Sequence, residues 1–226
     1  MKSATTEPER PNECNVVHED NHILVVEKPA GLLTQPDHSG SPSLEDNARA
    51  YIRRSRAKPG EAFLHVVHRL DRDVGGIVVC ALTSKALSRL QAQQRAQAWR
   101  RTYRAWVAPA PSSDSSTLEH WLRHGEHRAE VVPSDTPEAR LCRLDFRVVR
   151  REPGRALIEV TLHTGRYHQI RAQLAAAGWP ILGDRKYGAT HPWPDGGIAL
   201  RHTELIFEHP VRRDSLRIEA PDDRFR

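Results

Sequence analysis

The sequence feature best suited to chemistry is an aspartate that lies between two arginines and precedes a pair of glycines. It occupies the segment His68-Arg69-Leu70-Asp71-Arg72-Asp73-Val74-Gly75-Gly76. A carboxylate flanked by guanidinium groups stays ionised, which suits a nucleophile or a general base and does not suit a general acid. The alternative, which local features alone favour, is a loop aspartate that pairs with its own arginines.

A second polar segment leads from a predicted strand into a predicted helix. It is His163-Thr164-Gly165-Arg166-Tyr167-His168-Gln169-Ile170-Arg171. The free amides and the positive dipole of a helix N-terminus favour a phosphate or a carboxylate there. Ile170 and Leu174 belong to the core face, and Arg171 lies roughly 100° around the helix from Ile170. Arg171 is therefore expected to border the core and reach a cleft. The alternative is an ordinary amphipathic helix with a basic outer face.

Hydrophobic patterning predicts the elements that position these two segments. Asp71 is expected on a loop between short buried strands at 63–67 and 77–82, where a rigid scaffold can hold a functional residue. Other strands are predicted over 21–27, 102–107, 144–148, 158–162, 198–207 and 215–219. Helices are predicted over 43–55, 84–99 and 166–177, capped by Ser43 and Ser84 and closed by Gly178. Many strands with a few interspersed helices indicate the α+β class.

The length of 226 residues fits one domain with a substantial core. We expect the polar residues 1–13 to form a flexible tail and residues 14–226 to form a single domain. No stretch is apolar for long enough to span a membrane, and the start lacks the apolar core of a signal peptide. Cys14, Cys80 and Cys142 are odd in number and far apart, which argues against a disulfide framework and for the cytoplasm.

The charge balance points to an anionic partner. The chain has 34 Lys and Arg against 29 Asp and Glu, for a net charge of +5, and most of the cations are arginines. The guanidinium fork binds phosphate oxygens in a bidentate way, so nucleic acid is favoured slightly over the alternative of solvated basic faces.

Six short blocks follow one another in a specific order along the chain. They are Lys28-Pro29-Ala30-Gly31-Leu32, His68-Arg69-Leu70-Asp71, Arg101-Thr102-Tyr103-Arg104-Ala105, the segment 165–174, Pro180-Ile181-Leu182-Gly183-Asp184 with Lys186-Tyr187-Gly188, and Leu205-Ile206-Phe207-Glu208-His209-Pro210. Together they resemble the RluA-type family of RNA pseudouridine synthases, without the N-terminal RNA-binding domain that many relatives carry. The resemblance implies the pseudouridine synthase fold, a bent mixed but mostly antiparallel sheet with flanking helices and a central basic cleft.

The resemblance also implies a role for each matching residue. Asp71 matches the family's essential aspartate, which attacks at or near the anomeric carbon of the target uridine. Tyr103 matches the tyrosine that stacks on the target base, and Arg171 matches the basic residue that pairs with the aspartate. Arg69 matches an arginine that fills the gap left in the RNA stack when the uridine flips out. Leu200 is expected to pack near the base.

The implied reaction converts specific uridines of structured ribosomal or transfer RNA to pseudouridine, with no cofactor and no metal. The carboxylate either adds to the sugar or removes a ribose proton to give a glycal, and the sequence leaves both routes open. We expect a monomer whose catalytic domain, residues 14–226, grips the RNA itself. The residues expected to contact RNA are Arg53, Arg54, Arg56, Arg69, Arg72, Arg166 and His168.

Four positions depart from the family pattern. Val74-Gly75 replaces the usual Thr-Ser pair and removes two hydroxyls from the loop after Asp71. Tyr167 stands where threonine is usual, and Gln173 stands where histidine is common. None of these changes removes a residue that the resemblance assigns to chemistry.

Three other classes of protein compete with this interpretation. A non-catalytic RNA-binding or RNA-folding protein could use the same scaffold and charge. A metal enzyme would use histidines such as His124 and His127, which have no carboxylate or cysteine at ligand spacing. A hydrolytic nucleosidase or glycosidase would need a second carboxylate opposite Asp71, for which Asp73 is the nearest candidate.

Overall fold

The computed structural model describes residues 14–56, 63–194, 197–221 and 225, so the tail expected over 1–13 lies outside the described residues. Its strands are β1 (Asn15–Glu19), β2 (Ile23–Lys28), β3 (His65–Val66), β4 (Gly75–Ala81), β5 (Arg100–Val107), β6 (Ser115–His124), β7 (Ala129–Val131), β8 (Arg140–Glu152), β9 (Arg155–Leu162), β10 (Leu200–Glu208) and β11 (Ser215–Glu219). Its helices are α1 (Leu44–Ser55), α2 (Ser84–Arg95), α3 (Gln169–Ala176) and the 3-10 turn η1 (Arg185–Tyr187).

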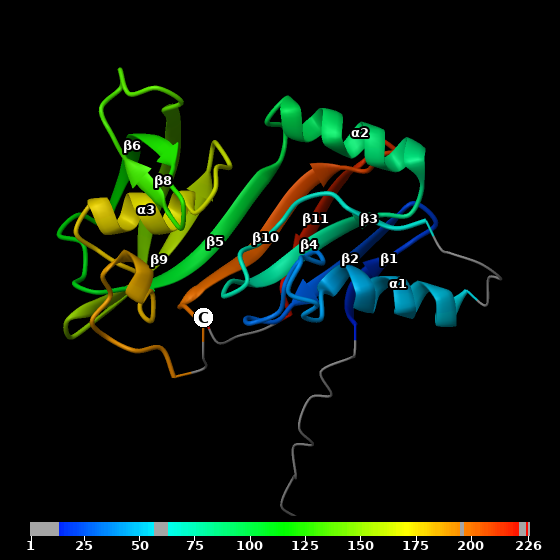
Figure 1. Ribbon diagram of the computed structural model, residues 1–226, viewed down its shortest axis with the longest axis horizontal. Helices are drawn as coiled ribbons and strands as arrows, with labels where there is room; N and C mark the ends of the chain where they lie inside the picture. The colour runs from blue at the N-terminus through cyan, green and yellow to red at the C-terminus, as the bar shows by residue number, and fades with distance from the viewer. Residues whose placement is uncertain (1–13, 57–62, 195–196, 222–224, 226) are drawn as a thin grey trace, which may run out of the picture.

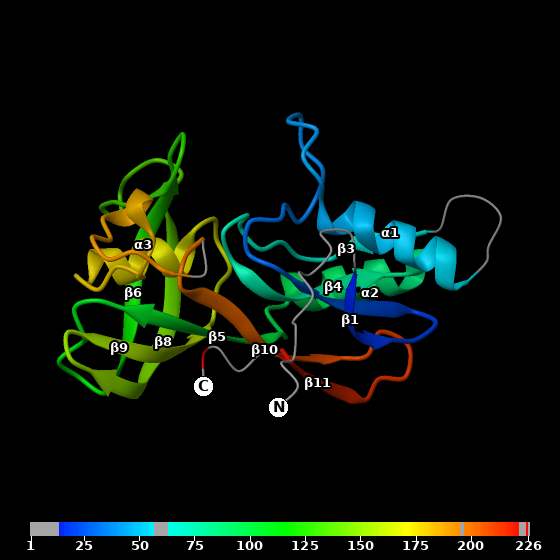
Figure 2. The same ribbon diagram turned by 90° about the horizontal axis from the view of Figure 1, so that it is seen from below.

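All of these strands join one sheet in the order β1-β2-β4-β10-β5-β9-β8-β6-β7, with β3 added to β4 and β11 added to β10. The β4–β10 pair is parallel and the other named pairs are antiparallel. In Figure 1, β6 and β8 run in a different direction from the diagonal strands β4 and β10, so the sheet bends across its middle. Figure 2 shows two halves, one with α3 and one with α1 and α2, joined through β5 and β10. The predicted α+β class and mostly antiparallel sheet are confirmed.

Strands β2 and β4 separate two cores, because successive side chains of a strand point to opposite faces of the sheet. Those on one face pack in the core that contains the buried residues of α1: Leu24, Val26, Val78 and Cys80. Those on the other face pack in the core that contains the buried residues of α2: Ile23, Val25, Ile77 and Val79. The two helices therefore cover opposite faces, as Figure 1 shows.

The three helices lie in the predicted parts of the chain, but some of their ends differ from the prediction. Ser43 caps α1 as predicted, with its hydroxyl accepting from the Asp46 amide at 3.2 Å. The cap of α2 is Thr83, and that helix ends at Arg95 instead of 99, before the positive φ of 54° at Gln97. Helix α3 begins at Gln169, three residues later than predicted, because His168 adopts a left-handed conformation with φ of 52°.

Three strands escaped the sequence prediction: β1, β6 and β7. Strand β6 presents mostly exposed or half-buried positions, so it lacks the regular apolar alternation that identifies a strand. Strand β7 is only three residues long. Among the described residues, no helix combines the length and apolar character that a membrane span needs.

Candidate active site

Asp71 lies between β3 and β4, on a loop that a buried lysine holds in place. The Lys28 ammonium donates to the Arg72 carbonyl at 2.9 Å and to two carbonyls of its own turn, those of Pro29 at 3.0 Å and Leu32 at 2.6 Å. These acceptors match the three N–H donors of an ammonium group. Burial lowers the pKa of Lys28 to about 7, against the opposing effect of the nearby carboxylates of Asp73 and Asp71. Lys28 therefore joins the turn after β2 to the loop that carries Asp71.

The rest of this loop is held without the two hydroxyls that Val74-Gly75 lacks. The Thr34 hydroxyl donates to the Leu70 carbonyl at 2.7 Å and accepts from the Leu70 amide at 3.2 Å. The Val74 amide donates to the Asp71 carbonyl at 3.1 Å, and its side chain is 2% exposed in the core. The main chain around Asp71 is thus fixed by Lys28, by Thr34 and by the backbone bond from Val74.

Arg171 reaches Asp71 from α3, so the predicted contact is present. Its Nη1 donates to Asp71 Oδ2 at 3.0 Å, while Nε and Nη2 donate to the two carboxylate oxygens of Asp184 at 2.7 and 2.9 Å. Asp184 is 1% exposed and Arg171 is 4% exposed. Burial alone would lower the pKa of Arg171, but the two aspartates outweigh it and raise that pKa. Asp184 therefore orients the guanidinium whose remaining nitrogen faces Asp71.

The tautomer of His168 follows from its neighbours. Arg171 Nη1 lies 3.0 Å from His168 Nε2, and a guanidinium can only donate, so Nε2 accepts and the ring proton is on Nδ1. That proton points to the Tyr187 hydroxyl at 3.0 Å. The hydroxyl also accepts from the Ala129 amide at 2.8 Å and donates to the Ala129 carbonyl at 3.2 Å. Burial and then Arg171 lower the pKa of His168 to about 3, so the ring is neutral.

Tyr103 stands in the same pocket, with the ring of His202 stacked on it at a centroid distance of 4.5 Å and an interplanar angle of 19°. His202 Nδ1 lies 2.8 Å from the Ile77 carbonyl and therefore donates to it. Gly76 allows the main chain of His202 to lie close to β4, because a Cβ at this position would lie 2.3 Å from the His202 carbonyl oxygen. Its φ of +121° also favours glycine. Burial raises the pKa of Tyr103 to about 12, so the phenol is neutral.

The pocket collects the residues that the sequence assigned to chemistry. Asp71, Arg171 and His168 are among its polar lining residues. Its apolar wall consists of Leu70, Val74, Tyr103, Leu162, Ile170 and Leu200. Leu200 is 4% exposed at the start of β10. It lines the pocket together with Asp71 and Tyr103.

The pocket adjoins a groove of about 910 Å³ that we call the arginine groove. Its cationic lining residues are Arg69, Arg95, Arg101 and Arg166. Asp71 is the sole carboxylate among the described residues that line it. None of the four arginines has an ion-pair partner within the described ranges, whereas arginines such as Arg147 and Arg217 elsewhere are paired with glutamates. A strip of unneutralised guanidinium groups suits a phosphate backbone.

The other residues predicted to contact RNA lie in different surroundings. Arg53 and Arg54 are exposed in the last turn of α1, at the end farthest from α3 in Figure 1, and line neither the pocket nor the groove. Arg56 donates to Glu19 at 2.9 and 3.2 Å and to the Asp20 carbonyl at 2.6 Å. Arg72 donates from Nε to the Gly31 carbonyl at 3.0 Å. His168 is only 8% exposed, inside the pocket.

Several residues that complete the site are not identified by the sequence patterns. Lys28 and Asp184 both lie in the blocks that carry the family resemblance, so those blocks were the available signal. Arg95 and Arg101 lie in an arginine cluster of the sequence, yet no local feature indicated that they face Asp71. Within the described ranges, no group of three His, Cys, Asp or Glu side chains is arranged to bind a metal. His124 stacks on Tyr167, and His127 lies 3.5 Å from Glu126.

Comparisons with known proteins identify the family and the fold. Residues 22–176 match the family model described as RNA pseudouridylate synthase. Ribosomal large subunit pseudouridine synthase D of Xylella fastidiosa is 34% identical over 220 residues, covering 92% of this chain and 65% of the relative. The synthase of the same name from Pseudomonas aeruginosa is 35% identical over 224 residues, covering 92% and 68%. The chain thus spans about two thirds of the length of these relatives.

A solved structure has the same fold. It is the human RNA pseudouridylate synthase domain containing 4, which superposes with a TM-score of 0.78 at 21% identity. The match covers 93% of this chain and 89% of that one.

Proposed function

The chain belongs to the RNA pseudouridylate synthase family, and we propose that it isomerises specific uridines of structured RNA to pseudouridine. The observation that carries the proposal is the contact of Asp71 with Arg171 in a pocket walled by Tyr103 and Leu200. The names of the relatives favour ribosomal RNA over transfer RNA as the substrate.

Asp71 is the group that acts on the ribose of the target. It either adds to the anomeric carbon or removes a ribose proton, and in both routes the bond from the sugar to the base nitrogen breaks. The base then rotates, and carbon five bonds to the anomeric carbon as the Asp71 carboxylate leaves that carbon or the ribose proton is returned. The proton of carbon five is lost, and the base nitrogen that left the sugar takes up a proton. This isomerisation conserves the atoms of the nucleotide and its redox state, so its chemistry requires neither a cofactor nor a metal. Arg171 supplies the counter-charge of the Asp71 carboxylate.

The detached base needs a dry surface that holds it while it turns. Tyr103 and Leu200 provide this surface, with the neutral Tyr103 ring supported from behind by His202. Flipping the uridine out of its stack costs a few kcal/mol, which contacts in the pocket offset. Arg69, which is exposed and lines both the pocket and the groove, fills the space that the uridine leaves. His168 contacts the target nucleotide only within the pocket.

The RNA backbone follows the arginine groove, where Arg95, Arg101 and Arg166 meet its phosphates. Arg53 and Arg54 form a second contact that only longer RNA reaches, and Arg56 and Arg72 join it by exchanging their present partners for phosphate. The enzyme acts as a monomer with one catalytic domain over residues 14–226. We assign it to the cytoplasm, where the free thiols of its cysteines stay reduced.

Release of tritium from uridine carbon five tests the reaction directly. Transcripts of ribosomal and transfer RNA labelled at that position are incubated with the protein, and pseudouridine is mapped at nucleotide resolution. We expect tritium release at a small number of sites. Binding without release on every transcript would support the non-catalytic alternative, and free uracil among the products would support a hydrolase.

We expect Arg95→Ala and Arg166→Ala each to weaken RNA binding and flatten its salt dependence. Each lost phosphate contact should reduce the slope of log affinity against log salt by about 0.7 to 0.9. Filter binding of a short RNA hairpin between 50 and 200 mM salt, roughly the range over which such contacts are most visible, measures this slope. Arg53→Ala and Arg54→Ala are the matched controls and should leave the short hairpin unaffected. Equal losses in all four variants would contradict the groove as the main backbone contact.

A further inference from the structure

Three aromatic rings form a stack that leads from Asp71 to the open wall of the arginine groove. The ring of Tyr167 stacks on His168 at a centroid distance of 3.8 Å and an angle of 21°. It also stacks on His124 at 4.4 Å and 24°. His168 and His124 make no ring contact with each other within the described residues, so they cover opposite faces of the tyrosine. We call these residues the ring stack.

The inner end of the ring stack is fixed by the active site. His168 Nε2 lies 3.5 Å from Asp71 Oδ2 and accepts from Arg171, while its other nitrogen donates to Tyr187. The left-handed backbone of His168 directs this ring into the pocket just before α3 begins. The position of Tyr167 is therefore tied to the same contacts that orient Arg171 toward Asp71.

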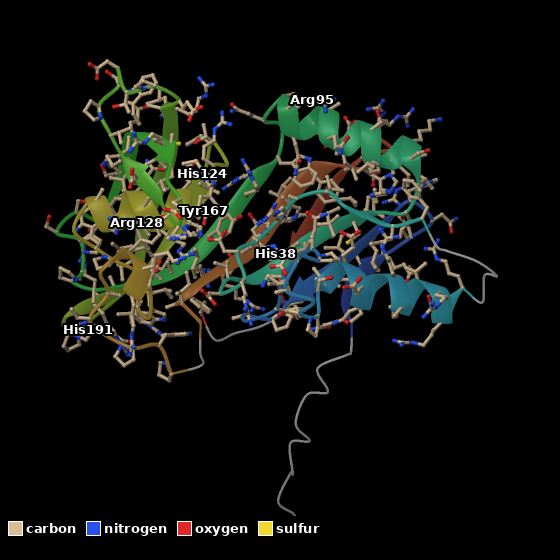
Figure 3. The ribbon with its side chains drawn as sticks, viewed as in Figure 1. His38, Arg95, His124, Arg128, Tyr167 and His191 are labelled. Carbon is tan, nitrogen blue, oxygen red and sulfur yellow. The ribbon has the colours of Figure 1, made fainter. Side chains whose placement is uncertain are left out.

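The outer end of the ring stack is open. His124 is exposed at the end of β6, lines the arginine groove, and has no second stacked ring among the described residues. Tyr167 is 39% exposed and lines the same groove. Figure 3 shows His124 and Tyr167 next to each other, with Arg95 above and to their right, at the end of α2. The free face of His124 is thus presented where the RNA backbone is expected to pass.

We propose that His124, supported by Tyr167, is a stacking platform for an unpaired nucleobase next to the target uridine. The inference rests on the proposed function because it takes the ligand of the groove to be RNA. A flat ring with an open face, flanked by unneutralised guanidinium groups, is the combination by which proteins hold single-stranded nucleic acid: the cations bind phosphates and the ring binds a base. The ring stack extends by one more ring when the base is bound. Threonine at position 167, the residue usual in the family, would leave His124 unsupported.

This platform has a consequence for the substrate. A base stacked on His124 has left its own helix, so the RNA must be single-stranded or locally melted on one side of the target. The platform positions the RNA and takes no part in bond breaking. Loss of His124 should therefore raise KM with little change in kcat.

Binding of an RNA without uridine separates the platform from catalysis. The probe is a fluorescein-labelled strand of eight adenosines, compared with a strand of eight abasic ribose phosphates. We expect the wild-type protein to bind the adenosine strand at least about five-fold more tightly than the abasic strand, since stacking of one base contributes this much or more. His124→Ala and Tyr167→Thr should lose most of this preference while keeping the affinity for the abasic strand. His124→Phe should keep the preference, because phenylalanine retains a flat ring.

His191→Ala is the matched control, because His191 is exposed and lies away from the groove, at the lower left of the ribbon in Figure 3. It should behave as the wild type does with both strands. An unchanged base preference in His124→Ala would overturn the proposal, as would equal binding of the two strands by the wild-type protein. A preference that depends on His124, in a protein that releases no tritium from any transcript, would support the platform and contradict only the proposed reaction.

Discussion

Replacing Asp71 by asparagine is expected to abolish pseudouridine formation while leaving RNA binding intact. The amide can neither add to the sugar nor accept a ribose proton, so turnover should fall by about four orders of magnitude or more. Arg171 keeps its two bonds to Asp184, so the pocket retains its geometry. Removing a negative charge from the lining of the arginine groove should leave the Kd for RNA equal or lower. Single-turnover tritium release and filter binding measure the two effects.

Asp73→Asn is the matched control for this prediction. It makes the same chemical change two residues away, at a side chain that lines neither the pocket nor the groove. The Asp73 carbonyl still accepts from the Ile198 amide, so the backbone contact is retained. We expect normal turnover from Asp73→Asn. Wild-type turnover by Asp71→Asn would remove Asp71 from the mechanism, and equal losses in both variants would point to the loop instead of the carboxylate.

Replacing Arg171 by methionine should have the second largest effect, on stability and activity together. It leaves the Asp184 carboxylate, which is 1% exposed, without the only side chain in the described part of the chain that bonds to it. Breaking such a buried pair from one side costs about 3–5 kcal/mol of unfolding free energy. Activity should also be lost, because Asp71 loses its counter-charge. Urea denaturation and tritium release measure the two consequences.

A double variant separates the two roles of Arg171. Arg171→Met combined with Asp184→Leu removes both buried charges, and an apolar pair of this kind is often as stable as the ion pair that it replaces. We expect the double variant to recover most of the lost unfolding free energy and to remain inactive. Activity that returned together with stability would show that Arg171 serves only to hold the fold, and that its contact with Asp71 has no part in catalysis.

Features that depend on neighbouring residues could be predicted from the sequence. The predicted strand over 215–219 matches β11, Ser43 caps α1, and Asp71 lies between β3 and β4, because alternation and turn-forming residues are local properties. The sequence pattern places the start of α3 three residues too early. A histidine with positive φ has no local signal, and His168 adopts it among contacts with Arg171 and Tyr187 that lie elsewhere in the structure.

The sequence by itself determined which residue types are available for chemistry and placed Asp71, Tyr103 and Arg171 in ordered blocks. Only the tertiary structure decided their partners. Arg171 lies 100 positions from Asp71 along the chain, and the pocket forms because β10 lies between β4 and β5 in the sheet. Strand order in a sheet is set by packing of the whole chain, so spacing along the sequence does not reveal it. Asp184 and Lys28 lie in sequence blocks that resemble the family. Their contacts with Arg171 and with the loop of Asp71, however, form only in the folded chain.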